Sequence, residues 1–160
     1  MRYLIISDIH GNKKGLDEVL KRENDIDKVI FLGDGLSDVV RAKKDYPKLQ
    51  FDVVRGNCDI SNSIAPMQVI TIGNYKVLMC HGDGFDVKMS LLPLRRSAIA
   101  LDATIALYGH THKQYYEYLD GLYIFCPGSI NRDICADFKV CYGIMDLNHP
   151  KPLFYHKMLE

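Results

Sequence analysis

The residues best suited to chemistry follow short apolar runs, in five motifs that read, in order, SDIHGN, FLGDG, VRGNCD, CHGD and YGHTH. Each motif places a carboxylate, an imidazole or an amide beside a glycine, at the point where an apolar run ends. Side chains of these types bind divalent metal ions, and the glycines let the backbone turn sharply and approach a ligand closely. The candidate metal ligands are Asp8, His10, Asp34, Asn57, His81, His110 and His112.

The donor types of this set indicate which metals it can hold. Histidine nitrogens, carboxylate oxygens and one amide oxygen suit Mn²⁺, Fe²⁺, Zn²⁺, Co²⁺ or Ni²⁺ better than Ca²⁺ or Mg²⁺, and no thiolate is included. Seven ligands exceed the needs of one tetrahedral ion, so we expect two ions that share a bridging carboxylate. Two ions about 3.5–4 Å apart can hold a hydroxide and neutralise a phosphoryl oxygen during in-line attack. A single histidine at a strand end is usually just solvated, but a repeated pattern favours metal binding.

The apolar runs that carry these motifs predict the elements that position them. We expect strands over residues 2–8, 28–34, 51–57, 76–82 and 103–110. Their nearly continuous hydrophobicity is typical of sheets covered on both faces. Helical patterns over 13–23 and 36–46 separate the first three strands, which predicts a βαβαβ start with parallel strands. Since ligands bind beyond the carboxyl ends of such strands, the motifs should converge at one edge.

The second half of the chain predicts hairpins instead. Residues 68–82 turn at Gly73-Asn74, residues 114–128 turn at Asp120-Gly121, and residues 140–159 form a third hairpin. One helix is expected around residues 86–101, interrupted or started near Pro93. Together these elements predict two packed β-sheets flanked by helices, as a single domain over residues 1–160.

Composition narrows the class of protein. The 160 residues are 48% hydrophobic, and 20 Lys and Arg balance 20 Asp and Glu, which disfavours a nucleic-acid polymer as the substrate. The five cysteines form no CxxC pair, the N-terminal apolar stretch is too short for a signal peptide, and no apolar run is long enough to span a membrane. We therefore predict a cytoplasmic protein with reduced thiols and no membrane partner. The edges of the hairpins leave a homo-oligomer open.

The ordered motifs resemble the calcineurin-like metallophosphoesterase superfamily. The short length and the sequence CPGSINR over residues 126–132 resemble its compact YfcE-like phosphodiesterase branch, and the similarity runs from residue 7 to about residue 132. The resemblance implies an α/β fold, a four-layer αββα sandwich of two mixed β-sheets flanked by helices. It also implies a small phosphodiester substrate and two divalent ions, with Mn²⁺ as the first candidate.

The resemblance further implies how the ligands are divided between the two ions. Asp8, His10 and His112 would bind one ion, and Asn57, His81 and His110 would bind the other. Asp34 would bridge both ions. The residues alone support the set of seven but leave this partition open.

One position departs from the pattern of many family members. Cys58, followed by Asp59, stands where many members carry the histidine that protonates the leaving group. A thiol with a pKa of about 8.5 is a poor general acid near neutral pH. We therefore predict that the enzyme favours phosphodiesters over alkyl phosphomonoesters, with Asn57, Cys58 and Asp59 as the candidate catalytic residues. The alternative is that Cys58 merely packs beside the site. Asp83 also stands where many relatives carry histidine.

Several interpretations stay open at this point. Asn12 and Asp59 could orient histidines or contact phosphate, and Arg55 and Arg132 could pair with substrate or be solvated. A second hypothesis is a non-catalytic protein-assembly scaffold of the same fold, like a subunit of the retromer complex. Since no ligand position is missing here, the enzyme is favoured. Cyclic nucleotides, dinucleotides and other small diesters are all possible substrates.

Overall fold

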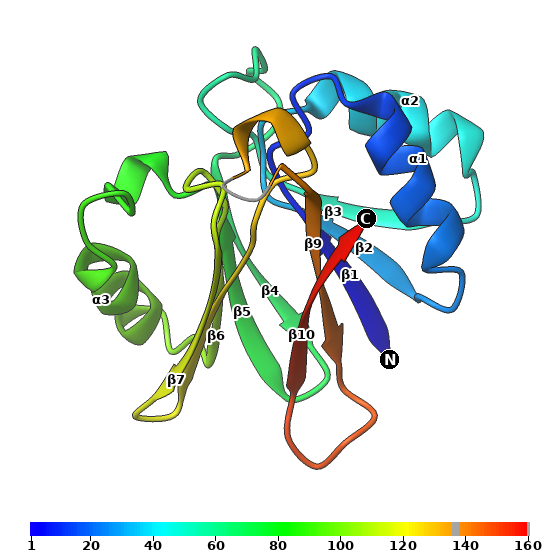
Figure 1. Ribbon diagram of the computed structural model, residues 1–160. Coiled ribbons are helices and arrows are strands. Elements are labelled where there is room, and N and C mark those ends of the chain that lie inside the picture. The colour runs from blue at the N-terminus through cyan, green and yellow to red at the C-terminus, as the bar shows by residue number, and fades with distance from the viewer. Residues whose placement is uncertain (136–137, 160) are drawn as a thin grey trace.

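The computed structural model describes residues 1–135 and 138–159, and two mixed five-stranded β-sheets organise them (Figure 1). The first sheet has the order β10-β9-β1-β2-β3, with bounds Leu153–Leu159, Val140–Asp146, Arg2–Ile6, Lys28–Phe31 and Gln50–Val53. The second has the order β4-β5-β6-β8-β7, with bounds Met67–Ile72, Tyr75–Cys80, Ile105–Leu107, Leu122–Pro127 and Gln114–Leu119. The strands β1, β2 and β3 are parallel, as are β5, β6 and β8.

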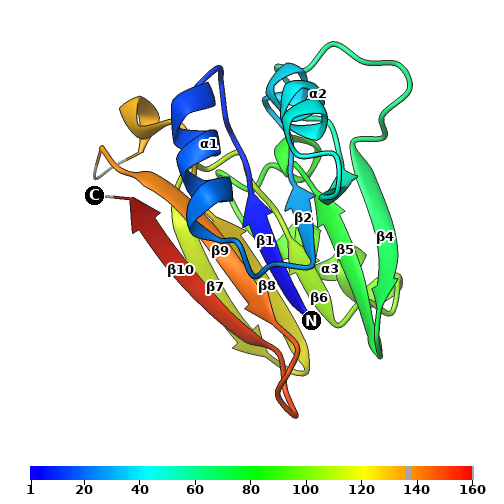
Figure 2. The ribbon, with the colours of Figure 1, turned by 90° about the vertical axis from the view of Figure 1, so that its right-hand side faces the viewer.

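Helices cover the outer face of each sheet, which makes four layers (Figures 1 and 2). The α-helices of the described residues are α1 (Lys13–Arg22), α2 (Leu36–Asp45) and α3 (Leu92–Ala100), and the two 3₁₀ turns are η1 (Asp83–Phe85) and η2 (Arg132–Ile134). Apolar residues of α1 and α2 pack on the first sheet, and those of α3 pack on the second. No helix among the described residues combines the length and apolarity needed to cross a membrane. The predicted αββα sandwich is confirmed.

The strand β1 shows why its sequence is apolar at every position. Leu4 and Ile6 pack in the cluster between the first sheet and its helices, whereas Ile5 packs in the cluster between the two sheets. Successive side chains of a strand point to opposite faces, so a strand with both faces covered needs apolar residues throughout. The same alternation occurs in β2, where Phe31 faces the helices and Ile30 faces the other sheet.

The predicted elements are confirmed, with shorter strands. All three hairpins form, and α3 begins at Leu92 with Pro93 in its first turn. The strands end two to four residues before the sequence prediction because the backbone leaves the ladder just ahead of each polar motif. The β1 ladder, for example, ends at Ile6, so Asp8 lies in the loop beyond it.

Candidate metal centre

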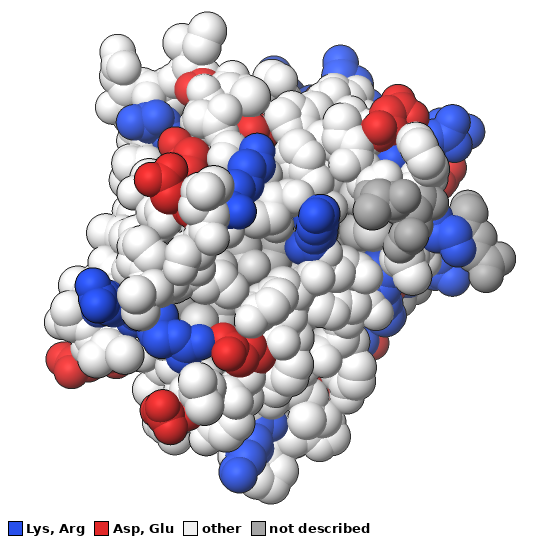
Figure 3. All heavy atoms as spheres, turned by 60° about the vertical axis from the view of Figure 1, so that its left-hand side comes forward, with Lys and Arg blue, Asp and Glu red and all other residues white. Residues whose placement is uncertain are grey.

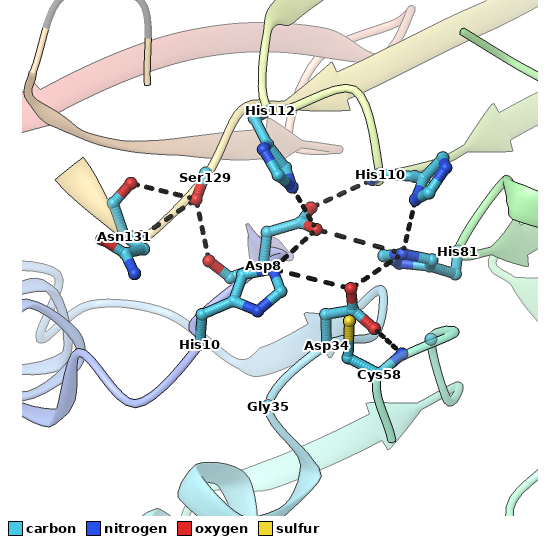
Figure 4. Close-up of polar contacts among 12 residues, drawn as sticks. Asp8, His10, Asp34, Gly35, Cys58, His81, His110, His112, Ser129 and Asn131 are labelled. Carbon is cyan, nitrogen blue, oxygen red and sulfur yellow. Dashed lines mark hydrogen bonds and ion pairs between the residues drawn. The ribbon is translucent and has the colours of Figure 1, made fainter. Parts of the chain in front are cut away.

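The loops after β1, β2, β3, β5 and β6 bring all of the predicted ligands to one end of the sheets. Figure 4 shows most of this cluster, with carboxylates at its centre and imidazoles around them. Asp8 and His10 come from the β1–α1 loop, and Asp34 follows β2. Asn57, His81, His110 and His112 come from the loops after β3, β5 and β6. The convergence expected from the strand ends is present.

One set of donors surrounds Nε2 of His81. This nitrogen lies 3.1 Å from Oδ1 of Asn57 and 3.1 Å from Nδ1 of His110. It lies 3.3 Å from Oδ2 of Asp34. A tetrahedral ion with bonds of about 2.0–2.2 Å requires ligand atoms about 3.3–3.5 Å apart. Each of the three distances from Nε2 of His81 is close to the spacing that two ligands of one ion have.

A second set surrounds Oδ1 of Asp8. This oxygen lies 3.1 Å from Nε2 of His112 and 3.6 Å from Nε2 of His10. The same nitrogen of His10 lies 3.5 Å from Oδ2 of Asp34. One carboxylate oxygen of Asp34 therefore lies close to both sets, which is the position a bridging ligand needs.

The Asp8 carboxylate is the strongest sign that the cluster is built for a cation. Its Oδ2 accepts a hydrogen bond from the backbone N–H of His110 at 3.0 Å. Its Oδ1 is buried and accepts no hydrogen bond of normal geometry. A buried carboxylate oxygen that accepts no well-formed hydrogen bond favours a positive charge beside it, from a metal ion or from the nearby imidazoles of His112 and His10. The residues present therefore fit a divalent ion.

His81 is held in the tautomer that a metal ligand requires. Its Nδ1 lies 2.8 Å from the carbonyl oxygen of Leu32, which can only accept a hydrogen bond, so Nδ1 carries the proton. The lone pair is then on Nε2, which faces the cluster. Hydrogen bonding of the second ring nitrogen commonly orients histidine ligands in this way.

The charges of the cluster shift its pKa values in opposite directions. Burial acts to raise the pKa of Asp8, but contacts with His10 and His112 outweigh it and hold that pKa well below its usual range. Burial acts to lower the pKa of His81, but Asp34 and Asp8 raise it. Without an ion, the carboxylates are therefore compensated by their histidine neighbours.

The backbone at the cluster is strained. Five of the seven candidate ligands have positive φ angles, namely Asp8 (54°), His10 (43°), Asp34 (62°), His110 (66°) and His112 (58°). Such angles cost about 1–3 kcal/mol at each residue other than glycine, and persist only where the surrounding structure enforces them. Strain of this kind concentrates at functional sites, and here it aims the ligands inward.

Asp59 accepts hydrogen bonds from four backbone N–H groups. Its Oδ2 accepts the N–H groups of Asp34 and Gly56, both at 2.8 Å. Its Oδ1 accepts those of Gly35 and Leu36, both at 2.9 Å. Four donors use all the lone-pair positions of a carboxylate. Through these contacts Asp59 holds the Asp34 loop and the start of α2. A catalytic role of Asp59 stays a prediction, and these hydrogen bonds do not support it.

Cys58 is oriented toward the cluster. Figure 4 shows its sulfur directed toward Asp34 and His10. The sulfur lies within 4.8 Å of donor atoms of both residues. Burial and the neighbouring Asp34 raise the pKa of the thiol above its ordinary value. The predicted set of metal ligands contained no sulfur. The structure places the Cys58 sulfur at the edge of the cluster as a further possible donor.

The remaining candidates lie around the cluster rather than in it. Asn12 caps α1 by accepting the N–H of Gly15 at 3.1 Å, and its Nδ2 donates to the carbonyl of Ile130 at 2.8 Å. Arg132 lines a cavity beside His10. Arg55 and Asp83 line a separate cavity together with Gly82.

One supporting residue escaped the sequence interpretation. Ser129 is fully buried, and its hydroxyl donates to the backbone carbonyl of Asp8 at 2.8 Å (Figure 4). The backbone N–H of Asn131 donates to the same carbonyl at 3.2 Å. Both residues belong to the CPGSINR motif. The sequence marked this motif as a family feature but did not indicate that it contacts the Asp8 loop.

The close approach of Gly109 to this loop leads to a stability prediction. Gly109→Ala is expected to lower the free energy of unfolding by about 1–3 kcal/mol, because the new Cβ would lie 1.9 Å from Oγ of Ser7 and 3.0 Å from Oδ2 of Asp8. Gly84→Ala is the matched control, since its Cβ meets nothing within 4 Å. Urea denaturation followed by circular dichroism compares the two variants, and equal stability would contradict the packing.

The fold and the cluster define a two-sheet α/β protein with a candidate divalent-metal centre. Residues 1–149 match the model of the calcineurin-like phosphoesterase superfamily domain, and the chain belongs to this family. It is 35% identical over 132 residues to a Bacillus subtilis protein named probable metallophosphoesterase YsnB, over 81% of this chain and 75% of that protein. Family membership supports a metal-dependent phosphoesterase activity.

Solved structures share the fold at lower identity. Vps29 of Entamoeba histolytica, solved in complex with Zn²⁺, superposes with a TM-score of 0.76 at 23% identity, covering 99% of this chain and 92% of that one. A structure described as a novel archaeal phosphodiesterase superposes with a TM-score of 0.75 at 21% identity, covering 99% and 100% of the two chains. These likenesses show the arrangement of the sheets and helices.

Proposed function

We propose that the protein is a phosphodiesterase with two divalent metal ions, acting on small phosphodiesters. The observation that carries the proposal is the division of the donor atoms into two sets that share Oδ2 of Asp34. Asp8, His10 and His112 would hold one ion, and Asn57, His81 and His110 the other. The mixed nitrogen and oxygen donors suit Mn²⁺, with Ni²⁺, Fe²⁺, Zn²⁺ and Co²⁺ as alternatives.

The chain's own residues prepare the site for in-line attack on phosphorus. Divalent ions bound here supply the Lewis acidity that activates water and neutralises a phosphoryl oxygen. The Nδ1–H of His81, held by the Leu32 carbonyl, keeps the ring nitrogen that faces the cluster free to bind. Asp59 and Ser129 hold the backbone of Asp34 and Asp8, so that the carboxylates need no rearrangement when a substrate arrives.

The reaction is tested with bis(p-nitrophenyl) phosphate and a series of added metals. Wild-type protein is expected to release p-nitrophenol with Mn²⁺ or Ni²⁺, and His81→Ala to lose at least about a hundredfold in kcat/KM because a direct ligand is removed. His149→Ala, which changes an exposed histidine outside the cluster, is the control. Turnover without metal, or no turnover with any metal, would refute the proposal.

Cys58 supports the preference for diesters. Its raised pKa makes the thiol a weaker acid than the imidazole found there in many relatives, so alkoxide leaving groups gain little help. Cys58→His is expected to raise the rate on 2-glycerophosphate relative to bis(p-nitrophenyl) phosphate by about tenfold or more. Phosphate release and p-nitrophenol release measure the two rates, and Cys58→Ser controls for loss of the thiol. An unchanged ratio would count against this role of Cys58.

A scaffold function is the second candidate, since Vps29 structures share this fold. A complete donor set favours the enzyme, because protein assembly alone does not require one. The cytoplasmic location, a homo-oligomer and the small size of the substrate stay predictions. No disulfide joins the cysteines among the described residues, and the reduced state of the thiols stays a prediction.

A further inference from the structure

A cavity of about 670 Å³ lies beside the turn that carries two of the candidate ligands. It is lined by residues 87–91, which precede α3, by residues of the β6–β7 connection, and by the first two residues of β7. Thr111 lines the cavity and lies between His110 and His112 in the chain. Two candidate metal ligands are thus the immediate chain neighbours of a residue that lines this cavity.

The cavity is positively charged. Lys88 and Lys113 line it, and no carboxylate does. In the part of the chain that the structure describes, neither ammonium group has a carboxylate oxygen within 4.0 Å. Figure 3 shows the face that carries α3, where separate blue side chains stand over a mostly white middle. The two lysine charges are thus available to an anionic group.

A second cavity, which includes the candidate ligand His10, has no excess of positive charge. It has a volume of about 530 Å³. Its Lys14 lies 4.0 Å from Glu18, and its Arg132 lies 3.7 Å from Asp133. Each cation there already has an acidic neighbour, so the two cavities differ in charge although both adjoin the cluster.

The lysine-lined cavity also offers an apolar surface. Met89 is 87% exposed and Tyr115 is 37% exposed, and both line it together with Leu91. Tyr108 is buried and lies near Tyr115, with ring centroids 6.5 Å apart. Exposed aromatic and thioether side chains bind flat organic groups well.

We propose that this cavity is a binding subsite for the organic part of a phosphodiester substrate that carries a second phosphate. Lys88 and Lys113 would bind that phosphate, and Met89, Leu91 and Tyr115 would contact the flat or apolar body. The substrate class is therefore a small diester with an additional terminal phosphate, such as a 5′-phosphorylated dinucleotide. The inference rests on the proposed function for the position of the scissile diester.

The test compares two dinucleotides that differ only in the terminal phosphate, pApA and ApA. Wild-type protein with Mn²⁺ is expected to cleave pApA with a kcat/KM about tenfold or more above that for ApA. Lys88→Gln and Lys113→Gln are each expected to remove most of this preference while leaving the rate on bis(p-nitrophenyl) phosphate unchanged. Lys14→Gln, in the opposite cavity, is the matched control and should keep the preference.

Calorimetric binding of both dinucleotides to the metal-free protein provides a readout without turnover. Tighter binding of pApA that is lost in Lys88→Gln supports the subsite. Equal affinity for pApA and ApA, or the same loss in Lys14→Gln as in Lys88→Gln, would overturn it. Absence of bis(p-nitrophenyl) phosphate turnover would refute the proposed function separately, because the binding comparison does not depend on catalysis.

Discussion

Asp34→Asn is expected to lower kcat/KM on bis(p-nitrophenyl) phosphate by at least about a thousandfold, which is about 4 kcal/mol of transition-state stabilisation. Oδ2 of Asp34 lies 3.3 Å from Nε2 of His81 and 3.5 Å from Nε2 of His10, between the two donor sets. Its Oδ1 accepts the backbone N–H of Cys58 at 2.8 Å. Asparagine keeps the shape of the side chain but removes the charge that two neighbouring cations would share.

The metal content of this variant separates a bridging ligand from a terminal one. If Asp34 contacts both ions, the asparagine variant should retain less of both after dialysis, as measured by inductively coupled plasma mass spectrometry. Asp45→Asn, which removes an exposed carboxylate at the far end of α2, controls for the change in net charge. A variant that holds two equivalents of metal and more than a tenth of the activity would contradict the bridging assignment.

Asp59→Asn is expected to destabilise the metal-free protein by about 2–4 kcal/mol, the second large effect. The carboxylate accepts four backbone N–H groups, and asparagine offers one acceptor oxygen and an amide that faces two of the same donors. The loss should appear as a lower urea midpoint with an unchanged slope. Activity should fall about ten- to a hundredfold, since Asp34 is then less well held.

This variant also distinguishes positioning from acid catalysis. A positioning residue changes the stability of the metal-free chain and leaves the ratio of diester to monoester activity unaltered. A proton donor would do the opposite. Asp86→Asn, in an exposed position near η1, is the matched control for stability. A stable Asp59→Asn protein with a changed ratio would return Asp59 to the catalytic role predicted from the sequence.

Much of the fold follows from local patterns in the sequence. The strand β1 is apolar at Leu4, Ile5 and Ile6 because helices cover one face and the second sheet covers the other. Pro93 lies in the first turn of α3, where its fixed φ and missing N–H are tolerated. The hairpin at Asp120-Gly121 forms as expected because both residues accept positive φ.

The identity of the candidate ligands also follows from the sequence, because a donor beside a glycine at a strand end is a local feature. Which of these donors lie near one another depends on the tertiary structure. His110 and His112 are two residues apart, yet Nδ1 of His110 lies 3.1 Å from His81 and Nε2 of His112 lies 3.1 Å from Asp8. The left-handed backbone at both residues turns their rings toward different neighbours.

The tasks of the residues around the cluster were likewise decided by contacts distant in sequence. Asp59 receives three of its four hydrogen bonds from the loop after β2 and the first residue of α2, and Ser129 donates a hydrogen bond to a carbonyl in the loop after β1. Lys88 and Lys113 share a cavity only because β6 lies between β5 and β8 in the second sheet. Composition and periodicity report which side chains are buried and which can bind, whereas the order of strands in a sheet determines which loops meet, and hence what each side chain does.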